Sequence, residues 1–354
     1  MLVDSPPESE QSAQPQPLPL TVTRKRRTLR AAGLLVSVGV LLLVCAAGIA
    51  VGAKSIPLGD VWHGLFHNSG TGNDVIVVDV RLPRTVLGLL VGAALGLAGA
   101  VMQALTRNPL AEPGLLGVNA GAAAAVVSAI SFFGVTSITG YVWFAFAGAA
   151  IVSVLVYALG GSRSATPVRL ALAGTAATAA LFGYVNAVQL LDSAALDRLR
   201  FWTVGSLASA DMSTVGKVWP FIAVGIVLAL LIARPLNALE MGDDTARSLG
   251  ASLTRTRVLA MLCVTLLCGG ATAACGPIVF VGLMVPHLVR AVTGPDMRWI
   301  LPYAAVLSPV LLLGADVVGR VVARPAELQV GIVTAIIGGP VFIQLVRRRR
   351  MAQL

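Results

Sequence analysis

Ionisable side chains within apolar segments are the residues that could do chemistry in this chain, and they are few. Asp316 stands four residues before Arg320 in an apolar segment, a spacing that lets the two side chains pair on one helix face, while Arg320 could also face a partner. The histidines His63, His67 and His287 are too scattered to form a metal site. No nucleophile elbow or pair of catalytic carboxylates is visible, so we predict no catalytic residue and no metal site.

Phosphate binding and thiol chemistry are not expected either. The Gly216-Lys217 pair is followed by valine, so the chain has no G-x-x-x-x-G-K-[ST] phosphate loop and is expected to bind no ATP or other cofactor by itself. If ATP and Mg are used, a partner would bind them. The four cysteines lie within or at the edge of apolar segments, which favours packing over a disulfide, metal or redox role; they are Cys45, Cys263, Cys268 and Cys275.

The composition is typical of an all-α integral membrane protein. Hydrophobic residues make up 56% of the 354 positions and charged residues only 12%, which lies outside the range of soluble domains. The segment Thr85 to Thr106 contains no charged residue. As a helix it would be about 33 Å long, enough to cross a hydrocarbon core of roughly 30 Å.

Apolar windows along the chain predict ten transmembrane helices. The longest apolar run, Val258 to Val292, would form a single helix of about 52 Å, far more than a bilayer needs. We divide it at Gly276 and Pro277, because proline lacks the backbone donor and restricts the residue before it. The predicted spans are 31–52, 85–106, 114–134, 141–160, 170–191, 218–233, 258–275, 277–292, 299–322 and 329–346.

The distribution of positive charge predicts the topology. Ten spans place both termini on one side, and most of the 26 Lys and Arg residues fall in the loops of that side, including Arg24 to Arg27 and Arg347 to Arg350. Cationic loops are typically cytoplasmic, so both termini are predicted to be cytoplasmic. The net charge of +10 is therefore a topology signal, and we expect no nucleic-acid partner.

The chain is expected to contain one membrane domain with short basic ends. Residues 1–30 are predicted to be a disordered cytoplasmic N-terminal tail and not a signal peptide, because the apolar segment that follows is long and lacks a convincing cleavage site. Residues 31–346 form the ten-helix domain, and residues 347–354 form a basic cytoplasmic tail.

The longest inner loop, about residues 236–257, has the pattern of two short helices. They are expected at Asn237 to Met241 and at Asp243 to Leu249, with Gly242 between them, Asp243 as a cap and Gly250 as the end. Apolar and charged residues alternate here, as in a segment that docks onto a soluble protein. The alternative is a solvated surface loop.

Two further segments carry packing or interface signals. Gly88, Gly92, Gly96 and Ala100 recur every four residues on the second span, a small-residue stripe that favours close helix packing. On the outer side, the segment 191–220 is expected to include a short amphipathic helix, with Trp202 and Trp219 as bilayer-interface anchors.

Several motifs in order give the chain a family resemblance. They are RLPR at 81–84, GAVMQ at 99–103, NPLAEPGLLG at 108–117, LGA at 249–251, VPHLVR at 285–290 and the segment from Leu312 to Pro340. Together they resemble the FecCD-type permease subunits of type II ABC importers for iron-siderophores, haem and cobalamin. The resemblance implies the ten-helix permease fold of that family.

The resemblance also implies partners. Such a subunit pairs with a second permease subunit in a homodimer, binds two cytoplasmic ATPase subunits that hold ATP and Mg, and receives substrate from an extracytoplasmic binding protein. It would lie in the cell membrane as a multi-pass protein in contact with lipid.

By the same resemblance, site residues can be assigned. Arg81, Arg84 and Arg320 match arginines that dock the binding protein, and Asn108 and Leu110 match the cytoplasmic gate. The residues that match the segment coupled to the ATPase are Asn237, Leu239, Met241, Gly242, Asp243, Asp244, Arg247, Leu249 and Gly250.

The leading hypothesis is an importer permease for a ferric siderophore, with no chemistry on the substrate. Cobalamin or haem are alternative substrates, and the preference for a siderophore rests on how common it is in the family. An ion-coupled secondary transporter and a non-transporting membrane scaffold are the rival classes.

Overall fold

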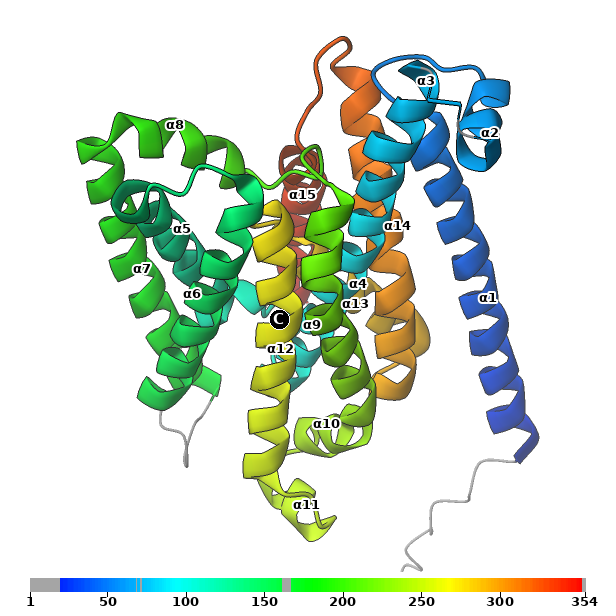
Figure 1. Cartoon of the computed structure of the whole chain (residues 1–354). Helices are drawn as coiled ribbons and strands as arrows, with labels where there is room; N and C mark the ends of the chain where they lie inside the picture. Colours follow the sequence, from blue (N-terminus) through cyan, green and yellow to red (C-terminus); the bar gives the residue numbers. More distant parts are fainter. Residues whose placement is uncertain (1–19, 68, 71, 161–166, 352–354) are drawn as a thin grey trace, which may run out of the picture.

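The computed structural model describes residues 20–67, 69–70, 72–160 and 167–351, and all regular elements in these ranges are helices (Figure 1). The elements are α1 (Leu20–Ala50), α2 (Leu58–His67), α3 (Gly72–Val75), η1 (Ile76–Arg81), α4 (Leu82–Thr106), η2 (Pro113–Leu116), α5 (Val118–Phe133), α6 (Ile138–Leu159), α7 (Pro167–Leu191), α8 (Ser193–Trp202), α9 (Met212–Leu231), α10 (Ala233–Glu240), α11 (Asp243–Ser248), α12 (Leu253–Cys275), α13 (Val281–Thr293), α14 (Met297–Val322) and α15 (Val330–Met351).

Each predicted apolar window coincides with one of these helices. Seven helices in the described residues are long and apolar enough to cross a membrane, and three shorter apolar helices accompany them: Val118–Phe133, Val281–Thr293 and Val330–Gln344. The shorter three are α5, α13 and α15. The prediction of an all-helical membrane protein is confirmed.

The division of the longest apolar run is confirmed. α12 ends at Cys275, and Gly276 follows with a φ of 74° in the left-handed region. A methyl group at Gly276 would collide with the backbone carbonyl of Trp202, so the close approach also requires glycine here. α13 begins only at Val281, after Phe280 has adopted a left-handed φ of 69°.

The small-residue stripe of α4 packs this helix tightly against α14. A methyl group at Gly92 would come within 2.5 Å of the Cα atom of Pro309, and Gly88 and Gly96 similarly face Leu313 and Ser308. Helices can approach this closely only where side chains are absent. The stripe therefore places α4 in the interior of the bundle, between α12 and α14 (Figure 1).

The basic ends of the chain are helical where the structure describes them. α1 begins at Leu20, so residues 20–30 are helical and not disordered as predicted, and α15 continues to Met351 through most of the predicted C-terminal tail. Lys and Arg have high helix propensity, and a helix that extends past an apolar segment keeps its backbone hydrogen bonds. Residues 1–19 and 352–354 lie outside the described residues.

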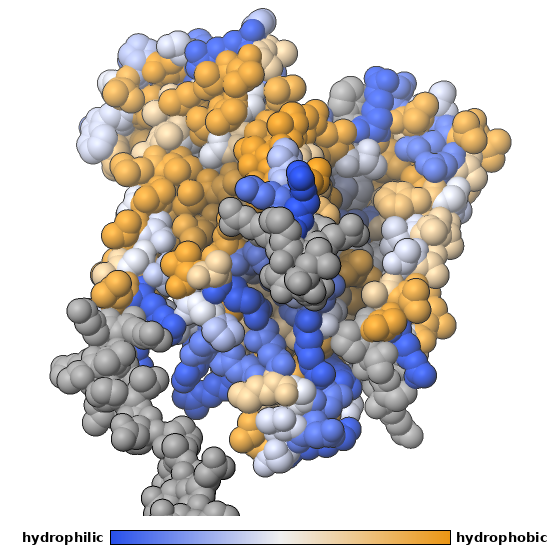
Figure 2. Space-filling view, turned by 180° about the vertical axis from the view of Figure 1, so that it is seen from behind, coloured by the Kyte–Doolittle hydropathy of each residue, from blue (hydrophilic) through white to orange (hydrophobic). Residues whose placement is uncertain are grey.

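Lipid-facing surface and polar surface are separated along the molecule. α1 stands at the edge of the bundle and exposes apolar side chains such as Leu35 (73%) and Leu43 (71%). Figure 2 shows apolar residues over the upper part of the molecule and hydrophilic residues gathered toward the lower end. In Figure 1, α2, α3 and α8 lie at the upper end and α10 and α11 at the lower end. We refer to them as the α8 end and the α11 end.

Candidate functional site

Arg84 and Asp316 form the centre of a buried charge cluster at the α8 end. Nε of Arg84 donates to both carboxylate oxygens of Asp316, at 3.1 and 3.0 Å, and Nη1 donates to Glu327 at 2.7 Å. Nη2 of Arg320 lies 3.0 Å from Oδ2 of Asp316, which confirms the predicted pairing of these two residues. Since the Asp316 side chain is 0% exposed, guanidinium groups and not water compensate its charge.

Arg81 caps the C-terminal end of α1. Its Nη1 donates to the carbonyl groups of Ile49 and Ala50, at 2.9 and 2.7 Å, and Nη1 of Arg320 donates to the carbonyl of Gly48 at 2.9 Å. The last carbonyls of a helix have no partner within the helix, and a cation there also interacts favourably with the helix dipole. These arginines fasten α1 to α4 and α14.

The docking role expected for Arg81, Arg84 and Arg320 requires charges that a partner can reach. In the isolated chain these residues are 3%, 4% and 2% exposed, respectively. Their guanidinium groups are bonded within the chain, so in this conformation they hold helix ends together and do not offer free charges. The docking role stays a prediction.

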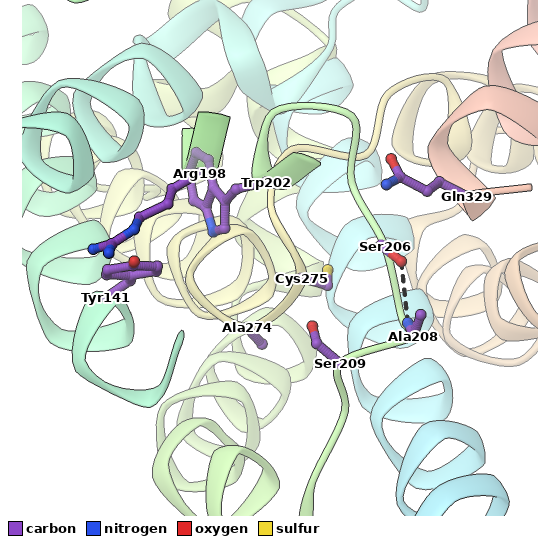
Figure 3. A pocket seen from close by; sticks show the side chains of 9 residues that line it. All are labelled: Tyr141, Arg198, Trp202, Ser206, Ala208, Ser209, Ala274, Cys275 and Gln329. Atoms are coloured by element: carbon purple, nitrogen blue, oxygen red, sulfur yellow. Dashed lines mark hydrogen bonds between the residues drawn. The ribbon is translucent and has the colours of Figure 1, made fainter. Parts of the chain in front are cut away.

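A cavity of about 230 Å³ opens beside α8 at the same end. In Figure 3, the guanidinium group of Arg198 lies beside the ring of Tyr141, Trp202 stands next to them, and Gln329 approaches from the other side. Trp202 is half-buried and packs against the core, and its role as a bilayer anchor stays a prediction. Trp219 is 52% exposed, as an anchor would be.

The predicted gate turn follows α4 at the α11 end. Arg107 ends the helix with a left-handed φ of 50°, and the side-chain oxygen of Asn108 then accepts a hydrogen bond from the backbone N–H of Leu110 at 3.0 Å. An asparagine of this kind stabilises a chain reversal. Asn108 is exposed and Leu110 is half-buried. The turn is tight, and its function as a gate remains a prediction.

Glu112 connects the segment after this turn to α13. Its Oε1 accepts a hydrogen bond from the backbone N–H of Phe280, the residue before α13, at 3.2 Å. Burial raises the pKa of the Glu112 carboxyl, and the hydrogen bond from Phe280 offsets only part of this effect. The sequence motif did not indicate this contact, because nothing in it shows that α13 returns to this loop.

The short helices α10 and α11 form the segment expected to contact an ATPase. Two helices separated by Gly242 are confirmed, but α10 begins at Ala233 and not at Asn237. Gly242 has a φ of 110° and Gly250, with a φ of 78°, follows the end of α11. A left-handed glycine is the usual end of a helix.

The side chains of this segment divide into exposed and buried sets. Met241 and Leu249 are 60% and 62% exposed, and the ion pair of Asp244 with Arg247 is also at the surface. By contrast, Leu239 is 1% exposed. The exposed set is therefore available to a partner, whereas Leu239 belongs to the core.

Asn237 holds α10 to the bundle. Its Nδ2 donates to Asp296 at 2.8 Å, and its Oδ1 accepts from the backbone N–H of Met297 at 2.8 Å. Hydrogen bonding to Arg298 and, less strongly, to Asn237 lowers the pKa of Asp296 to about 2, although partial burial opposes the shift. Asn237 is thus bonded within the chain and not presented outward.

The capping role predicted for Asp243 is wrong. Gly242, which has no side chain, occupies the cap position of α11. The carboxylate is instead ion-paired with Arg107 and, at 2.7 Å, with Arg257. Partial burial opposes ionisation of Asp243, but Arg257 and Arg107 outweigh it and hold the pKa below its usual value. Arg107 and Arg257 were not among the predicted site residues, and their position at the edge of an uncharged span was the only signal.

In the described part of the chain, no three His, Cys, Asp or Glu side chains gather as metal ligands would. The cysteines are free, and Cys263, Cys268 and Cys275 are buried among apolar helices. Cys45 is half-buried.

Comparison with known proteins agrees with this arrangement. A sequence model of the FecCD transport family matches residues 40–348. The ferric enterobactin transport system permease protein FepD of Escherichia coli is 46% identical over 325 residues, which cover 91% of this chain and 96% of the relative. The Fe(3+)-citrate import system permease protein YfmD of Bacillus subtilis is 39% identical over 327 residues, 92% of this chain and 98% of the relative.

A solved structure has the same fold. It is described as a metal-chelate type ABC transporter in an inward-facing conformation, and it aligns with a TM-score of 0.78 and 26% identity over 90% of this chain and 99% of its own. With the apolar helices described above, these similarities establish a multi-pass membrane protein. The chain belongs to the FecCD transport family.

Proposed function

We propose that this protein is the membrane-spanning permease subunit of an ATP-binding-cassette importer that carries a ferric siderophore or a related iron chelate into the cytoplasm. Membership of the FecCD transport family supports the proposal, as do relatives named for ferric enterobactin and Fe(3+)-citrate. Because the chain has no phosphate-binding loop, ATP and Mg would be bound by a separate ATPase subunit.

The observation that carries the proposal is the pair of short helices at the α11 end. α10 and α11 lie at the lower end of the bundle (Figure 1), with exposed Met241 and Leu249 beside the charged pair of Asp244 and Arg247. Apolar side chains rimmed by charges are typical of a surface that docks onto a soluble protein. A plain solvated loop has no need of exposed Met and Leu side chains.

The topology proposed for this function has ten membrane-spanning helices. The seven long helices would be joined by α5, α13 and α15, which are shorter but apolar and packed among them. Both termini and the α11 end would face the cytoplasm, in keeping with the cationic loops found there.

The proposed assembly has partners at both ends. Two permease subunits form a homodimer, two ATPase subunits bind the α11 end, and an extracytoplasmic binding protein docks at the α8 end. Substrate would pass between the subunits, with Asn108 and Leu110 at the cytoplasmic gate. Movement of α10 and α11 would switch access between the two sides, with no chemical change in the substrate.

The decisive experiment is uptake of a radiolabelled ferric siderophore into proteoliposomes that contain this protein with its ATPase subunit and binding protein. ATP-dependent uptake that needs all three components is expected. Uptake that persists without the ATPase subunit would instead identify an ion-coupled secondary transporter. Failure of the loaded binding protein to stimulate ATP hydrolysis would indicate a scaffold without transport activity.

The docking role of Arg81, Arg84 and Arg320 is tested by replacing all three with Glu. We expect weaker docking of the binding protein, with the ATPase still assembled. The introduced Glu side chains would repel the acidic residues through which the binding protein is proposed to dock. As these residues are buried, thermal unfolding must be measured on the same samples. Arg200, which is exposed at the same end, gives the control variant Arg200→Glu. Unchanged docking by a folded triple variant would reject the assignment.

The substrate is best identified through the cognate binding protein, since selectivity of such importers would reside largely there. Titration of that protein with ferric siderophores, haem and cobalamin separates the leading substrate class from its alternatives. A preference for haem or cobalamin would leave the permease assignment intact and change only the cargo.

A further inference from the structure

The side chain of Arg107 joins the end of α4 to both short helices at the α11 end. Its Nε donates to the backbone carbonyl of Leu239 at 2.9 Å, and its Nη2 is ion-paired with Asp243. Leu239 lies in the last turn of α10, and Asp243 is the first residue of α11. A planar guanidinium group presents several donors in fixed directions, so one side chain can hold both helices at once.

Asp243 is shared with a second arginine from another helix. Nη2 of Arg257, on α12, lies 2.7 Å from Oδ2 of Asp243, and the two side chains are 13% and 34% exposed. The carboxylate therefore bridges α4 and α12. Because the pair with Arg257 is partly sheltered from water, salt screens it less than a fully exposed pair.

The contact lies directly beside the gate turn. Arg107 has a left-handed backbone, and the next residue, Asn108, accepts the hydrogen bond that shapes the turn to Leu110. A displacement of α11 that moves Asp243 must break the ion pair with Arg107 or shift this turn. The body of α4 cannot easily follow, because Gly92 packs directly against Pro309 on α14.

Open space lies next to this contact. A cavity of about 310 Å³ lies where the end of α4 meets α10 and α13; its lining residues are Gln103, Arg107, Pro109, Glu240, Arg290 and Pro295. The ion pair of Arg290 with Glu240, at 2.8 Å, ties α13 to α10 at this cavity. The turn can therefore shift without overlap in the core.

We propose that Arg107 is a positioning residue that transmits movement of the α10–α11 segment to the turn from Asn108 to Leu110, with Asp243 as its partner. The inference rests on the proposed function, because it needs an ATPase that moves α11 and a gate at the turn. It adds a specific contact through which the α10–α11 segment could move the turn from Asn108 to Leu110.

The experiment measures import per ATP hydrolysed in proteoliposomes that contain the complete complex and a radiolabelled ferric siderophore. Arg107→Ala should lower this ratio about tenfold, the size expected when a charged hydrogen bond that couples two sites is lost. Arg107→Lys keeps the charge but cannot hold Leu239 and Asp243 in one plane, so an intermediate ratio is expected. Arg200→Ala, which removes an arginine from an exposed pair with Asp197 at the α8 end, is the control and should keep the ratio of the unmodified complex.

A double-mutant cycle identifies the partner. If Arg107 acts through Asp243, the loss in the combined variant Arg107→Ala with Asp243→Ala should be clearly smaller than the sum of the two single losses, because the ion pair between them is lost in each single variant. Additive losses would overturn the assignment of Asp243. An unchanged ratio in a folded Arg107→Ala complex would overturn the inference as a whole.

Two further outcomes keep the tests separable. If Arg107→Ala does not assemble, Arg107→Lys decides, and a ratio equal to that of the unmodified complex then counts against the link. If the unmodified complex shows no ATP-dependent import, the proposed function fails first. The inference about Arg107 is overturned by itself only when the unmodified complex imports and the Arg107 variants import equally well per ATP.

Discussion

The carboxylate of Asp316 on α14 accepts hydrogen bonds from Nε and Nη2 of Arg84 on α4, although the two residues are 232 positions apart in the chain. Both side chains are buried, and Arg320 and Glu327 complete the cluster. The pair joins two helices that pack closely along the small-residue stripe. A buried ion pair of this kind specifies which helix ends meet, and its loss leaves charges without compensation.

Replacement of the central carboxylate should therefore be strongly destabilising. We expect Asp316→Asn to lower the free energy of unfolding by about 3–5 kcal/mol, because two buried guanidinium groups lose the carboxylate charge that they share. Thermal or denaturant unfolding of the purified protein in detergent measures the change. Asp197→Asn is the matched control, since Asp197 pairs with Arg200 at the surface at 3.3 Å and should cost only about 0–1 kcal/mol. Equal losses in the two variants would contradict the structural role of Asp316.

Enlarging the small-residue stripe should separate α4 from α14. Gly92→Ala places a methyl group against the Pro309 backbone, and overpacking of this kind costs about 1–3 kcal/mol. Gly39→Ala on α1 is the control, because no atom lies within 4 Å of the position that its methyl group would occupy. The midpoint of thermal unfolding should fall for the first variant and stay the same or rise for the second. A harmless Gly92→Ala would show that the two helices can move apart freely.

Glu112 should make stability depend on pH. Burial raises the pKa of its carboxyl in the folded protein, so the folded state binds the proton more tightly than the unfolded state. The resulting stabilisation is complete below the ordinary carboxyl pKa of about 4.3 and is lost as the pH rises through the raised folded value. Unfolding midpoints measured across this window should fall less steeply for Glu112→Gln than for the unmodified protein. Parallel profiles would show that Glu112 does not titrate within it.

Asp296 should anchor α10 through Asn237 as well as cap α14. Its side chain accepts the backbone N–H of Arg298 at 3.0 Å and the Asn237 amide at 2.8 Å. Asp296→Ala is expected to cost about 1 kcal/mol from the cap alone and to speed hydrogen exchange in α10. In the control Asp211→Ala, α9 loses a comparable cap, a 2.7 Å bond from Thr214, with no effect on α10. Equal exchange rates of α10 in the two variants would contradict the anchoring role.

The pH dependence of this anchor has the opposite sign to that of Glu112. Hydrogen bonding to Arg298 is the main reason that the pKa of Asp296 is lowered to about 2. Its stabilisation is therefore present above the ordinary aspartate pKa of about 3.9 and is lost only as the pH falls toward the folded value. Hydrogen exchange in α10 should therefore not change through this anchor when the pH is varied around neutrality, because Asp296 stays ionised there.

The positions of the membrane helices could be predicted because they depend on local properties. A window without charges that is long enough for the bilayer is a helix wherever it occurs, and Pro277 with Gly276 marks the one break inside a long apolar run. Gly242 and Gly250 likewise mark helix ends by their own conformational freedom. The bounds of α1 and α15 were less predictable, because both helices continue beyond their apolar segments into basic residues that also favour helix.

The partners of the charged residues could not be predicted in the same way. Spacing on one helix was enough to pair Asp316 with Arg320. It could not show that Arg84 also binds Asp316, because Arg84 belongs to a different helix. Asp243 is a plausible cap when its own segment is considered alone. It becomes the partner of Arg107 and Arg257 only when α4 and α12 end beside it.

By itself, the sequence determined the class of protein, the placement of its apolar helices and, through its motifs, its family, because each of these depends on residues that are neighbours in the chain. Only the tertiary structure decided that Arg81, Arg84 and Arg320 are bonded inside the chain, that Glu112 reaches the start of α13, and that Arg107 pairs with Asp243 on α11. The physical reason is that a charge buried in the protein interior needs a partner of opposite charge or a hydrogen-bond partner. Helix packing determines which helix ends meet, and so it determines that partner.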